Sequence, residues 1–260
     1  MSRCLLIDGD IIAYQAAASI ERPINWGAGE AGEDLWTLHA FEDEGKEKVE
    51  SMLATIKEAC EGDRLVICLS DTANFRKTLY PNYKSNRAGT RKPMCLGPLK
   101  QYLIDQYETF IRPELEADDV LGILMTNTKV IPGEKVIVSI DKDLQTIPGL
   151  HYRTNEPERG VFEVTEALAN WKHLMQALTG DTSDGYPGCP GIGPKKAEEA
   201  LADFLTEDSF DTKAAWERIV AMYHKAKLGP EVALVQAQIA RICRAADYDF
   251  KNKKVIPWMP

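Results

Sequence analysis

Short apolar runs alternate with longer amphipathic stretches along the first 150 residues of the chain. Three of these runs are apolar over most of their length and predict buried strands: 3–8 (RCLLID), 64–71 (RLVICLSD) and 135–143 (KVIVSIDKD). The stretches between them have helical spacing, or an acidic start followed by apolar residues, and predict helices at 10–18, 45–61 and 116–125. Strands that alternate with helices are typical of an α/β domain with a mostly parallel sheet.

The pattern changes after residue 164, where only helical periodicity remains. We predict four helices there, at 165–178, 193–203, 211–226 and 230–245. The stretch 151–164 then links two regions. The sequence therefore predicts an α/β domain over 1–164 and a helical region over 165–260.

Cysteine, histidine and apolar content exclude several classes of site. The six cysteines form no CxxC pair and the four histidines are far apart, so we expect buried thiols and neither a zinc centre nor a disulfide framework. No apolar stretch approaches the length of a membrane span, and the N-terminus does not resemble a signal peptide. We expect a cytoplasmic protein without membrane contact, in the host cytoplasm if a phage encodes it.

Acidic residues gather where the predicted strands end and where a predicted helix begins. In an open α/β sheet the carboxyl ends of the strands meet at one rim, where ligands bind. Nine carboxylates are expected there: Asp8, Asp71, Glu116, Asp118, Asp119, Asp141, Asp143, Asp181 and Asp184. Clustered carboxylates raise one another's pKa unless a cation neutralises them. Oxygen ligands alone favour Mg²⁺ or Mn²⁺, and so many of them favour two ions, the arrangement used for in-line displacement at phosphorus.

The net charge of −9 equals the number of these carboxylates, so it does not exclude a nucleic-acid partner. The stretch 72–104 contains no acidic residue, although forty acids in 260 residues predict about five. It carries seven cations: Arg76, Lys77, Lys84, Arg87, Arg91, Lys92 and Lys100. Tyr80 and Tyr83 are interleaved, and cations combined with stacking rings are typical of a path for a nucleic-acid strand.

The stretch 178–197 (LTGDTSDGYPGCPGIGPKKA) joins the last acidic residues to a glycine-rich turn and a helix start. A helix N-terminus offers free backbone N–H groups and is a ready phosphate site. Gly191 and Gly193 form the predicted turn, and Lys195 and Lys196 add positive charge. We interpret this stretch as a site that binds the sugar–phosphate backbone of a DNA duplex at a fixed distance from the metal ions.

Five motifs, in this order, resemble the 5′-nucleases: LLIDGD, FRKTLYPNYKSNR, EADDVLG, SIDKDLQTI and GDTSDGYPGCPGIGPKKA. That family comprises the flap endonucleases, the phage 5′–3′ exonucleases and the 5′-nuclease domains of bacterial DNA polymerases. The resemblance covers residues 3 to about 203. It implies a PIN-like α/β domain, two divalent ions, and a helix-three-turn-helix at about 174–203 that binds DNA and often a K⁺ ion.

The resemblance also implies roles for individual residues. Asp8, Asp71, Glu116 and Asp118 match ligands of the first ion, Asp141, Asp143 and Asp184 match those of the second, and Asp119 and Asp181 match additional carboxylates. Tyr83 matches an aromatic on which a base stacks, Lys84 a lysine at the scissile phosphate, and Arg87 its basic neighbour. Asp10 stands where many members have a small polar residue, and the segment between Lys84 and Gly97 is short for a helical arch.

We therefore expect a metal-dependent 5′–3′ exonuclease or flap endonuclease that acts on DNA with a free 5′ end, a flap or a nick, with replication proteins as candidate partners. Two alternatives stay open at this point. The first keeps the chemistry but acts on RNA, as an RNase H-like enzyme on RNA–DNA hybrids or a PIN-type ribonuclease. The second is a DNA-structure-binding protein without catalysis.

Overall fold

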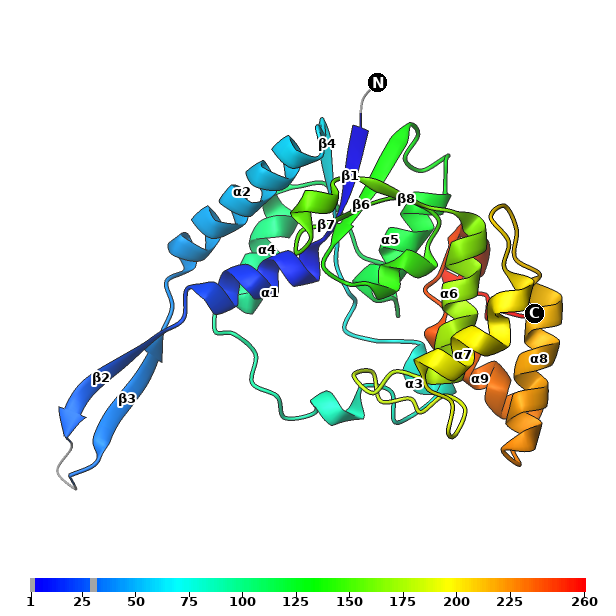
Figure 1. Ribbon diagram of the computed structural model, residues 1–260. Coiled ribbons are helices and arrows are strands. Elements are labelled where there is room, and N and C mark those ends of the chain that lie inside the picture. Colours follow the sequence, from blue (N-terminus) through cyan, green and yellow to red (C-terminus); the bar gives the residue numbers. More distant parts are fainter. Residues whose placement is uncertain (1–2, 29–31) are drawn as a thin grey trace.

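A six-stranded sheet forms the centre of the computed structural model, which describes residues 3–28 and 32–260 (Figure 1). The strand order is β5-β4-β1-β6-β7-β8, and every neighbouring pair is parallel except β7 with β8. The strands are β1 Arg3–Asp8, β4 Arg64–Cys68, β5 Thr109–Phe110, β6 Glu134–Ser139, β7 Gly149–Arg153 and β8 Phe162–Val164. The three predicted strands are confirmed as β1, β4 and β6, and the α/β class with them.

Helices cover both faces of this sheet. They are α1 Gly9–Ser19, α2 Glu42–Ala59 and α4 Leu96–Gln106 on one face, and α5 Ala117–Thr126 on the other. Side chains alternate between the faces along β1, so Leu5 and Ile7 join the core under α1, α2 and α4, whereas Leu6 joins the core under α5. The predicted helices 10–18, 45–61 and 116–125 are confirmed.

A helical region follows the sheet and has an apolar core of its own, which includes Leu174, Leu178, Ile219 and Tyr223. Its helices are α6 Glu166–Thr179, α7 Pro194–Leu201, α8 Thr212–Lys225 and α9 Pro230–Ala240. All four predicted helices are present, but the last ends five residues early. Beyond it the chain turns back to the sheet domain, where Ile242, Cys243 and Tyr248 pack into the core under α5.

Two parts of the chain differ from the sequence prediction. The stretch 151–164 is not a plain linker, because it contains the end of β7 and all of β8, which extend the sheet. A hairpin of β2 Arg22–Ala28 and β3 Asp34–His39 projects from the body between α1 and α2 (Figure 1), and exposes Trp26 and Trp36. The remaining short elements are α3 Arg76–Leu79, β9 Tyr248–Asp249 and β10 Lys254–Val255.

The six cysteines are all buried and free, as the sequence predicts. Across the described ranges 3–28 and 32–260, we find no helix with the length and apolar character needed to cross a membrane.

Candidate active site

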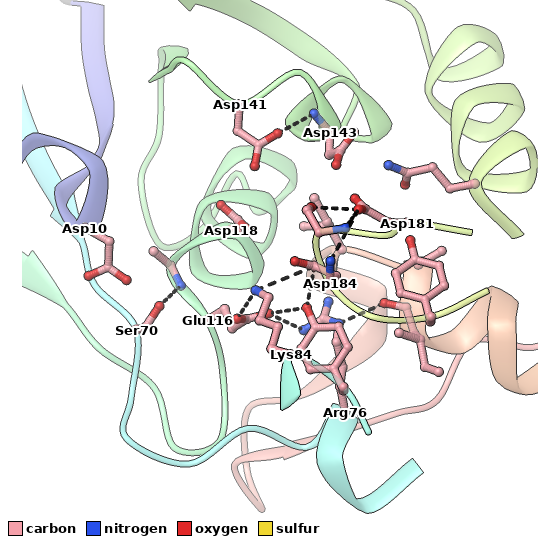
Figure 2. A pocket seen from close by; sticks show the side chains of 18 of the residues that line it. Asp10, Ser70, Arg76, Lys84, Glu116, Asp118, Asp141, Asp143, Asp181 and Asp184 are labelled. Atoms are coloured by element: carbon pink, nitrogen blue, oxygen red, sulfur yellow. Dashed lines mark hydrogen bonds and ion pairs between the residues drawn. The ribbon is translucent and has the colours of Figure 1, made fainter. Parts of the chain in front are cut away.

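An acidic pocket lies where β1 and β6 end and α5 begins (Figure 2). Its cavity has a volume of about 210 Å³. Seven of the nine predicted carboxylates line it: Asp8, Glu116, Asp118, Asp141, Asp143, Asp181 and Asp184. They come from four separate segments of the chain, so the parallel sheet brings them together as the strand-end argument predicts.

Two predicted ligands are turned away from the pocket, which corrects the sequence prediction. Strand β4 ends at Cys68, so Ser70 reaches the pocket and Asp71 lies beyond it. The Asp71 carboxylate accepts hydrogen bonds from the backbone N–H groups of Thr72 and Glu114, both at 2.8 Å, and orders this loop.

Asp119 is fully buried on the other side of α5, where its carboxylate accepts hydrogen bonds inside the protein. Its two oxygens accept from Arg76 at 2.7 and 2.8 Å, and the backbone N–H of Cys243 donates to it at 2.9 Å. Arg76 is only 2% exposed and also donates to the carbonyl oxygens of Ile239 and Arg241. The guanidinium of Arg76, predicted to contact DNA, instead joins α3, α5 and the end of α9 at the edge of the pocket.

Burial of the acidic side chains perturbs their titration. Asp8 is 3% exposed, accepts from Ser139 Oγ at 2.7 Å and caps α1 by accepting from Ile11 N–H at 3.2 Å. Burial, reinforced by Asp10 and Asp141, raises the pKa of Asp8 to about 7. Burial and neighbouring carboxylates also raise the pKa of Asp143 to about 7 and that of Asp118 well above its ordinary value. A cation in the pocket would remove this cost.

Two cations lie among these carboxylates, and Figure 2 shows Lys84 beside Glu116 and Asp184, on the side of the pocket away from Asp141. Lys84 Nζ contacts Glu116 and lies 3.6 Å from Asp184 Oδ2, and Arg87 Nη2 donates to Asp184 Oδ1 at 2.7 Å. Burial alone would raise the pKa of Glu116, but Arg76 and Lys84 hold it at about 2. Both residues predicted to be catalytic, Lys84 and Arg87, therefore face the carboxylates.

The backbone of Lys84 adopts a rarely occupied conformation and is held by a hydrogen bond. Its φ is +54°, in the left-handed region that non-glycine residues rarely occupy. Its N–H donates to the carbonyl oxygen of Asp184 at 2.7 Å. Strain of this kind costs about 1–3 kcal/mol and collects at functional sites. The segment 82–87 is thereby attached to the loop that carries Asp184.

Tyr83 does not offer its ring for stacking, contrary to the role that the resemblance implies. The residue is 3% exposed, and its hydroxyl lies 2.8 Å from both Glu116 Oε2 and Asp184 Oδ2. Burial and the nearby carboxylates raise the pKa of Tyr83 far above its ordinary value. Tyr83 therefore acts as a hydrogen-bond donor that orients two carboxylates.

The loop 180–188 presents Asp181 and Asp184 in a fixed conformation. Paired backbone hydrogen bonds of 2.9 and 3.0 Å join Asp181 to Tyr186, and Asp181 Oδ1 accepts from the backbone N–H and hydroxyl of Ser183 at 2.7 and 2.6 Å. Gly180 and Gly188 cross closely, with φ values of +66° at both, and a Cβ on either would lie within 2.5 Å of backbone atoms of the other strand of the loop. The glycines of this motif are thus required by packing.

The remaining predicted DNA-binding residues lie outside the pocket. Lys77, Arg91 and Lys92 are exposed, and Arg91 forms a bidentate pair with Glu21 at 2.6 and 2.7 Å. No regular helix forms between Ala88 and Cys95. This described segment is therefore an irregular loop and not a helical arch.

The glycine-rich turn enters α7 as predicted. Gly193 is the N-cap of α7, and Gly191 has a φ of +76°. Lys195 and Lys196 are exposed on the first turn, and Lys196 Nζ donates to the carbonyl oxygen of Gly191 at 3.0 Å.

The pocket suits a hard divalent cation by its chemistry. The lining supplies carboxylate oxygens and no histidine or cysteine, and those with raised pKa values would be stabilised by a positive ion. Among the described residues, however, no three or more His, Cys, Asp or Glu side chains form a ready-made metal site. The carboxylates surround the cavity, which fits an ion such as Mg²⁺ that keeps several water ligands.

Sequence reasoning missed two hydroxyls and one ion pair that shape the site. Ser139 holds Asp8, and Ser70 Oγ accepts from the backbone N–H of Ala117 at 2.9 Å at the start of α5. Asp10 lines the pocket and lies 2.7 Å from Lys100 Nζ, on α4. The one signal in the sequence was that both serines lie within the predicted strands 64–71 and 135–143.

Comparisons with known proteins agree with this geometry. The family described as 5′-3′ exonuclease, N-terminal resolvase-like domain matches residues 3–166. The exonuclease of Escherichia phage T7 is 30% identical over an alignment of 285 residues that covers 98% of this chain and 93% of that protein. The exodeoxyribonuclease of Enterobacteria phage T3 is 28% identical and is covered to 92%.

A solved structure shows that the fold is shared more widely. The T5 D15 protein co-crystallised with metal ions matches with a TM-score of 0.58 over 90% of this chain and 89% of that chain, at 15% identity. The resemblance inferred from the five motifs is thus confirmed. Because the family match extends over more than half of the chain, and the phage T7 exonuclease aligns along almost all of it, the chain belongs to the 5′-3′ exonuclease family.

Proposed function

We propose that this protein hydrolyses DNA phosphodiesters from a free 5′ end, as a 5′–3′ exonuclease that also cuts flaps, with Mg²⁺ or Mn²⁺ as cofactor. The observation that carries the proposal is the pocket itself, in which seven carboxylates face Lys84 and Arg87. Relatives named exonuclease, exodeoxyribonuclease and flap endonuclease Xni support the same activity.

The seven carboxylates fall into two groups around the cavity. We place one divalent ion between Asp8, Glu116 and Asp118, and a second near Asp141, Asp143, Asp181 and Asp184. Two such ions supply charge stabilisation for in-line attack of water at phosphorus. Asp71 and Asp119 are left out of both groups because other parts of the fold hold their oxygens.

Lys84 is the residue of the chain best placed to meet the scissile phosphate. Its ammonium group is held by Glu116 and Asp184, and its backbone N–H donates to the carbonyl oxygen of Asp184 at 2.7 Å. A positive charge fixed at the site where negative charge develops stabilises the transition state more than the bound substrate. Arg87 is more exposed and is suited to guiding an adjacent phosphate.

The helix-three-turn-helix formed by α6, the loop and α7 would hold the duplex part of the substrate. Free N–H groups at the start of α7, with Lys195 and Lys196, fit backbone phosphate. The carbonyl oxygen of Gly191 already attracts the ammonium of Lys196. We include a K⁺ ion at this turn in the proposal, because such an ion would take the same carbonyl oxygen.

Product analysis tests the proposed activity. Duplex, nicked, flapped and RNA–DNA hybrid substrates, labelled at either the 5′ or the 3′ end, are incubated with the protein in Mg²⁺ and in EDTA. We expect 5′-phosphate products from DNA ends and flaps in Mg²⁺ only. Asp141→Asn should abolish cleavage while retaining DNA binding in Ca²⁺, and Lys129→Ala, at the far end of α5 from the pocket, serves as the control.

The outcomes separate the alternatives. Preferential loss of the RNA strand of the hybrid would favour the RNase H-like activity. Tight binding without any product would favour a binding protein. Full activity of Asp141→Asn at saturating Mg²⁺ would contradict the assignment of the metal sites.

A further inference from the structure

A second group of cations lies outside the pocket, beyond Asp143. Lys142 stands in the turn after β6, Arg153 ends β7, and Arg159 belongs to the turn Pro157–Arg159 that follows. Because β6 and β7 are parallel, these turns meet at the rim that also holds the pocket. Arg153 Nη2 donates to the carbonyl oxygen of Ile140 at 2.8 Å, which joins the two turns.

Lys172 of α6 completes this group. The turn Asp143–Thr146 packs against α6, and the charges that act on Lys172 are Arg159, Asp143, Lys142 and Arg153. Lys172 stands one helical turn before Gln176, which lines the pocket. The group thus continues the Asp143 side of the pocket outward, away from Lys84.

Two lysines of this group lack an ion-pair partner. Arg153 and Arg159 share Glu156, the latter at 3.8 Å. Within the described ranges, Lys142 and Lys172 have no carboxylate within ion-pair distance. Two other partly buried lysines pair with carboxylates, Lys46 with Glu42 at 2.7 Å and Lys100 with Asp10 at 2.7 Å, and the buried Lys135 donates to two carbonyl oxygens. Lys172 is partly buried among cations, and burial lowers its pKa.

A partly buried lysine without an ion-pair partner, such as Lys172, is costly unless an anion binds to it. The guanidinium of Arg159 is also pre-positioned, because it lies 3.4 Å above the centroid of the Phe162 ring while its side chain stays 46% exposed. Arginine and lysine presented in this way are suited to phosphate oxygens. A protein partner is less well supported, because no large apolar side chain among the exposed ones belongs to this group.

We propose that Lys142, Arg159 and Lys172 form a cationic ledge that binds adjacent backbone phosphates of the nucleic acid on the Asp143 side of the pocket. The inference rests on the proposed function and deepens it. The substrate would be gripped on both sides of the cut, by the ledge on one side and by Lys84 and Arg87 on the other.

Salt-dependent binding tests the ledge. Fluorescence anisotropy in Ca²⁺ measures the affinity of wild type, Lys172→Gln, Arg159→Gln and the double variant for a labelled duplex with a 5′ overhang. Each lost phosphate contact on duplex should flatten the slope of log K against log salt by about 0.9, and the double variant by up to roughly 1.8. Lys172→Arg should restore most of the slope. Lys142 is left unchanged because it stands between Asp141 and Asp143.

A matched control and a folding check keep the test decisive. Lys129→Gln removes one exposed charge beyond the end of α5, far from the rim, and should leave the slope unchanged. Urea unfolding of each variant identifies loss of structure, and the exposed Arg159→Gln remains informative if Lys172→Gln is unstable. An unchanged slope in folded Arg159→Gln and Lys172→Gln would overturn the ledge.

Two further outcomes have defined meanings. Wild type that cleaves no DNA, but whose salt slope still depends on Arg159 and Lys172, would leave the ledge standing and remove the proposed function. Inorganic phosphate should compete with DNA for the ledge in wild type and less well in the double variant, which lacks two of the cations that hold phosphate oxygens. Inorganic phosphate that stabilises only wild type against urea, while neither substitution changes the salt slope of DNA binding, would indicate a site for free phosphate. That result would overturn the proposal.

Discussion

Replacement of Asp8 by asparagine should stabilise the metal-free protein at neutral pH. The substitution keeps the shape of the side chain and an oxygen that can accept from Ile11 N–H, and asparagine caps helices as well as aspartate does. The Ser139 hydroxyl, which donates to Asp8 at 2.7 Å, can reverse and accept from the new amide. The main change is therefore the loss of one buried charge.

The size of the gain in stability follows from the shift in the pKa of Asp8. Burial raises the pKa of Asp8 to about 7, whereas an unfolded aspartate titrates near ~3.9. Between these values the folded protein binds more protons than the unfolded chain, so its free energy of unfolding falls as pH rises and levels off above about 7. A shift of about three units corresponds to roughly 4 kcal/mol. Asp8→Asn should recover about 2–4 kcal/mol at pH 8 and little at pH 4.

Urea unfolding in EDTA at pH 4, 6 and 8 measures this directly, since the midpoint reports stability when the slope is constant. The free energy of unfolding of wild type should fall as pH rises, and that of the variant should fall less. The variant keeps some pH dependence because burial also raises the pKa of Asp143 to about 7. Added Mg²⁺ should stabilise wild type at pH 8 more than the variant, because ligands that bind only the folded state stabilise it. Parallel pH profiles, or a variant less stable than wild type at pH 8, would refute the reasoning.

Three further predictions concern residues whose contacts differ from the sequence prediction, or whose predicted role is still to be tested. Asp119→Asn leaves the Arg76 guanidinium buried without its counter-ion, and urea unfolding should show a loss of about 3–5 kcal/mol. Tyr83→Phe should lower the single-turnover cleavage rate, because two carboxylates lose a shared donor; a stacking role would leave the rate unchanged. Lys195→Ala/Lys196→Ala should flatten the salt slope of duplex binding by up to roughly 1.8, and an equal loss on single strands would contradict a duplex grip.

The central strands could be predicted because their residues are apolar on both faces. RCLLID and KVIVSIDKD fit a strand buried between two helical layers, and no other assignment suits so short an apolar run. The hairpin could not be predicted in this way. Strand β2 contains Pro23 and Gly27, both disfavoured in strands, and its apolar side chains are exposed instead of buried. Strand β8 spans only Phe162–Val164 and depends on its pairing with β7.

Strand order determined most of the site, because the carboxyl ends of parallel strands meet at one rim whatever the side-chain details are. Sequence could not tell which carboxylates were already engaged. Asp71 and Asp141 both follow apolar strands, but Asp71 accepts from Glu114 N–H in a distant loop as well as from its neighbour Thr72, whereas the backbone N–H that donates to Asp141 is that of Asp143 in the same turn. A partner that comes from the backbone of a distant loop leaves no trace in residue types.

The geometry of helix α5 explains why Asp118 lines the pocket and Asp119 does not. Neighbouring residues on a helix point about 100° apart, so Asp118 and Asp119 cannot both face one pocket. Asp118 faces the pocket, and Asp119 faces the core, where it also accepts from Glu116 N–H at 3.2 Å and so completes the start of α5. Its counter-ion, Arg76, comes from the basic stretch. One member of the acidic cluster and one member of the basic run therefore neutralise each other inside the fold, and their pairing holds α5 in the orientation that turns Asp118 and Glu116 toward the substrate.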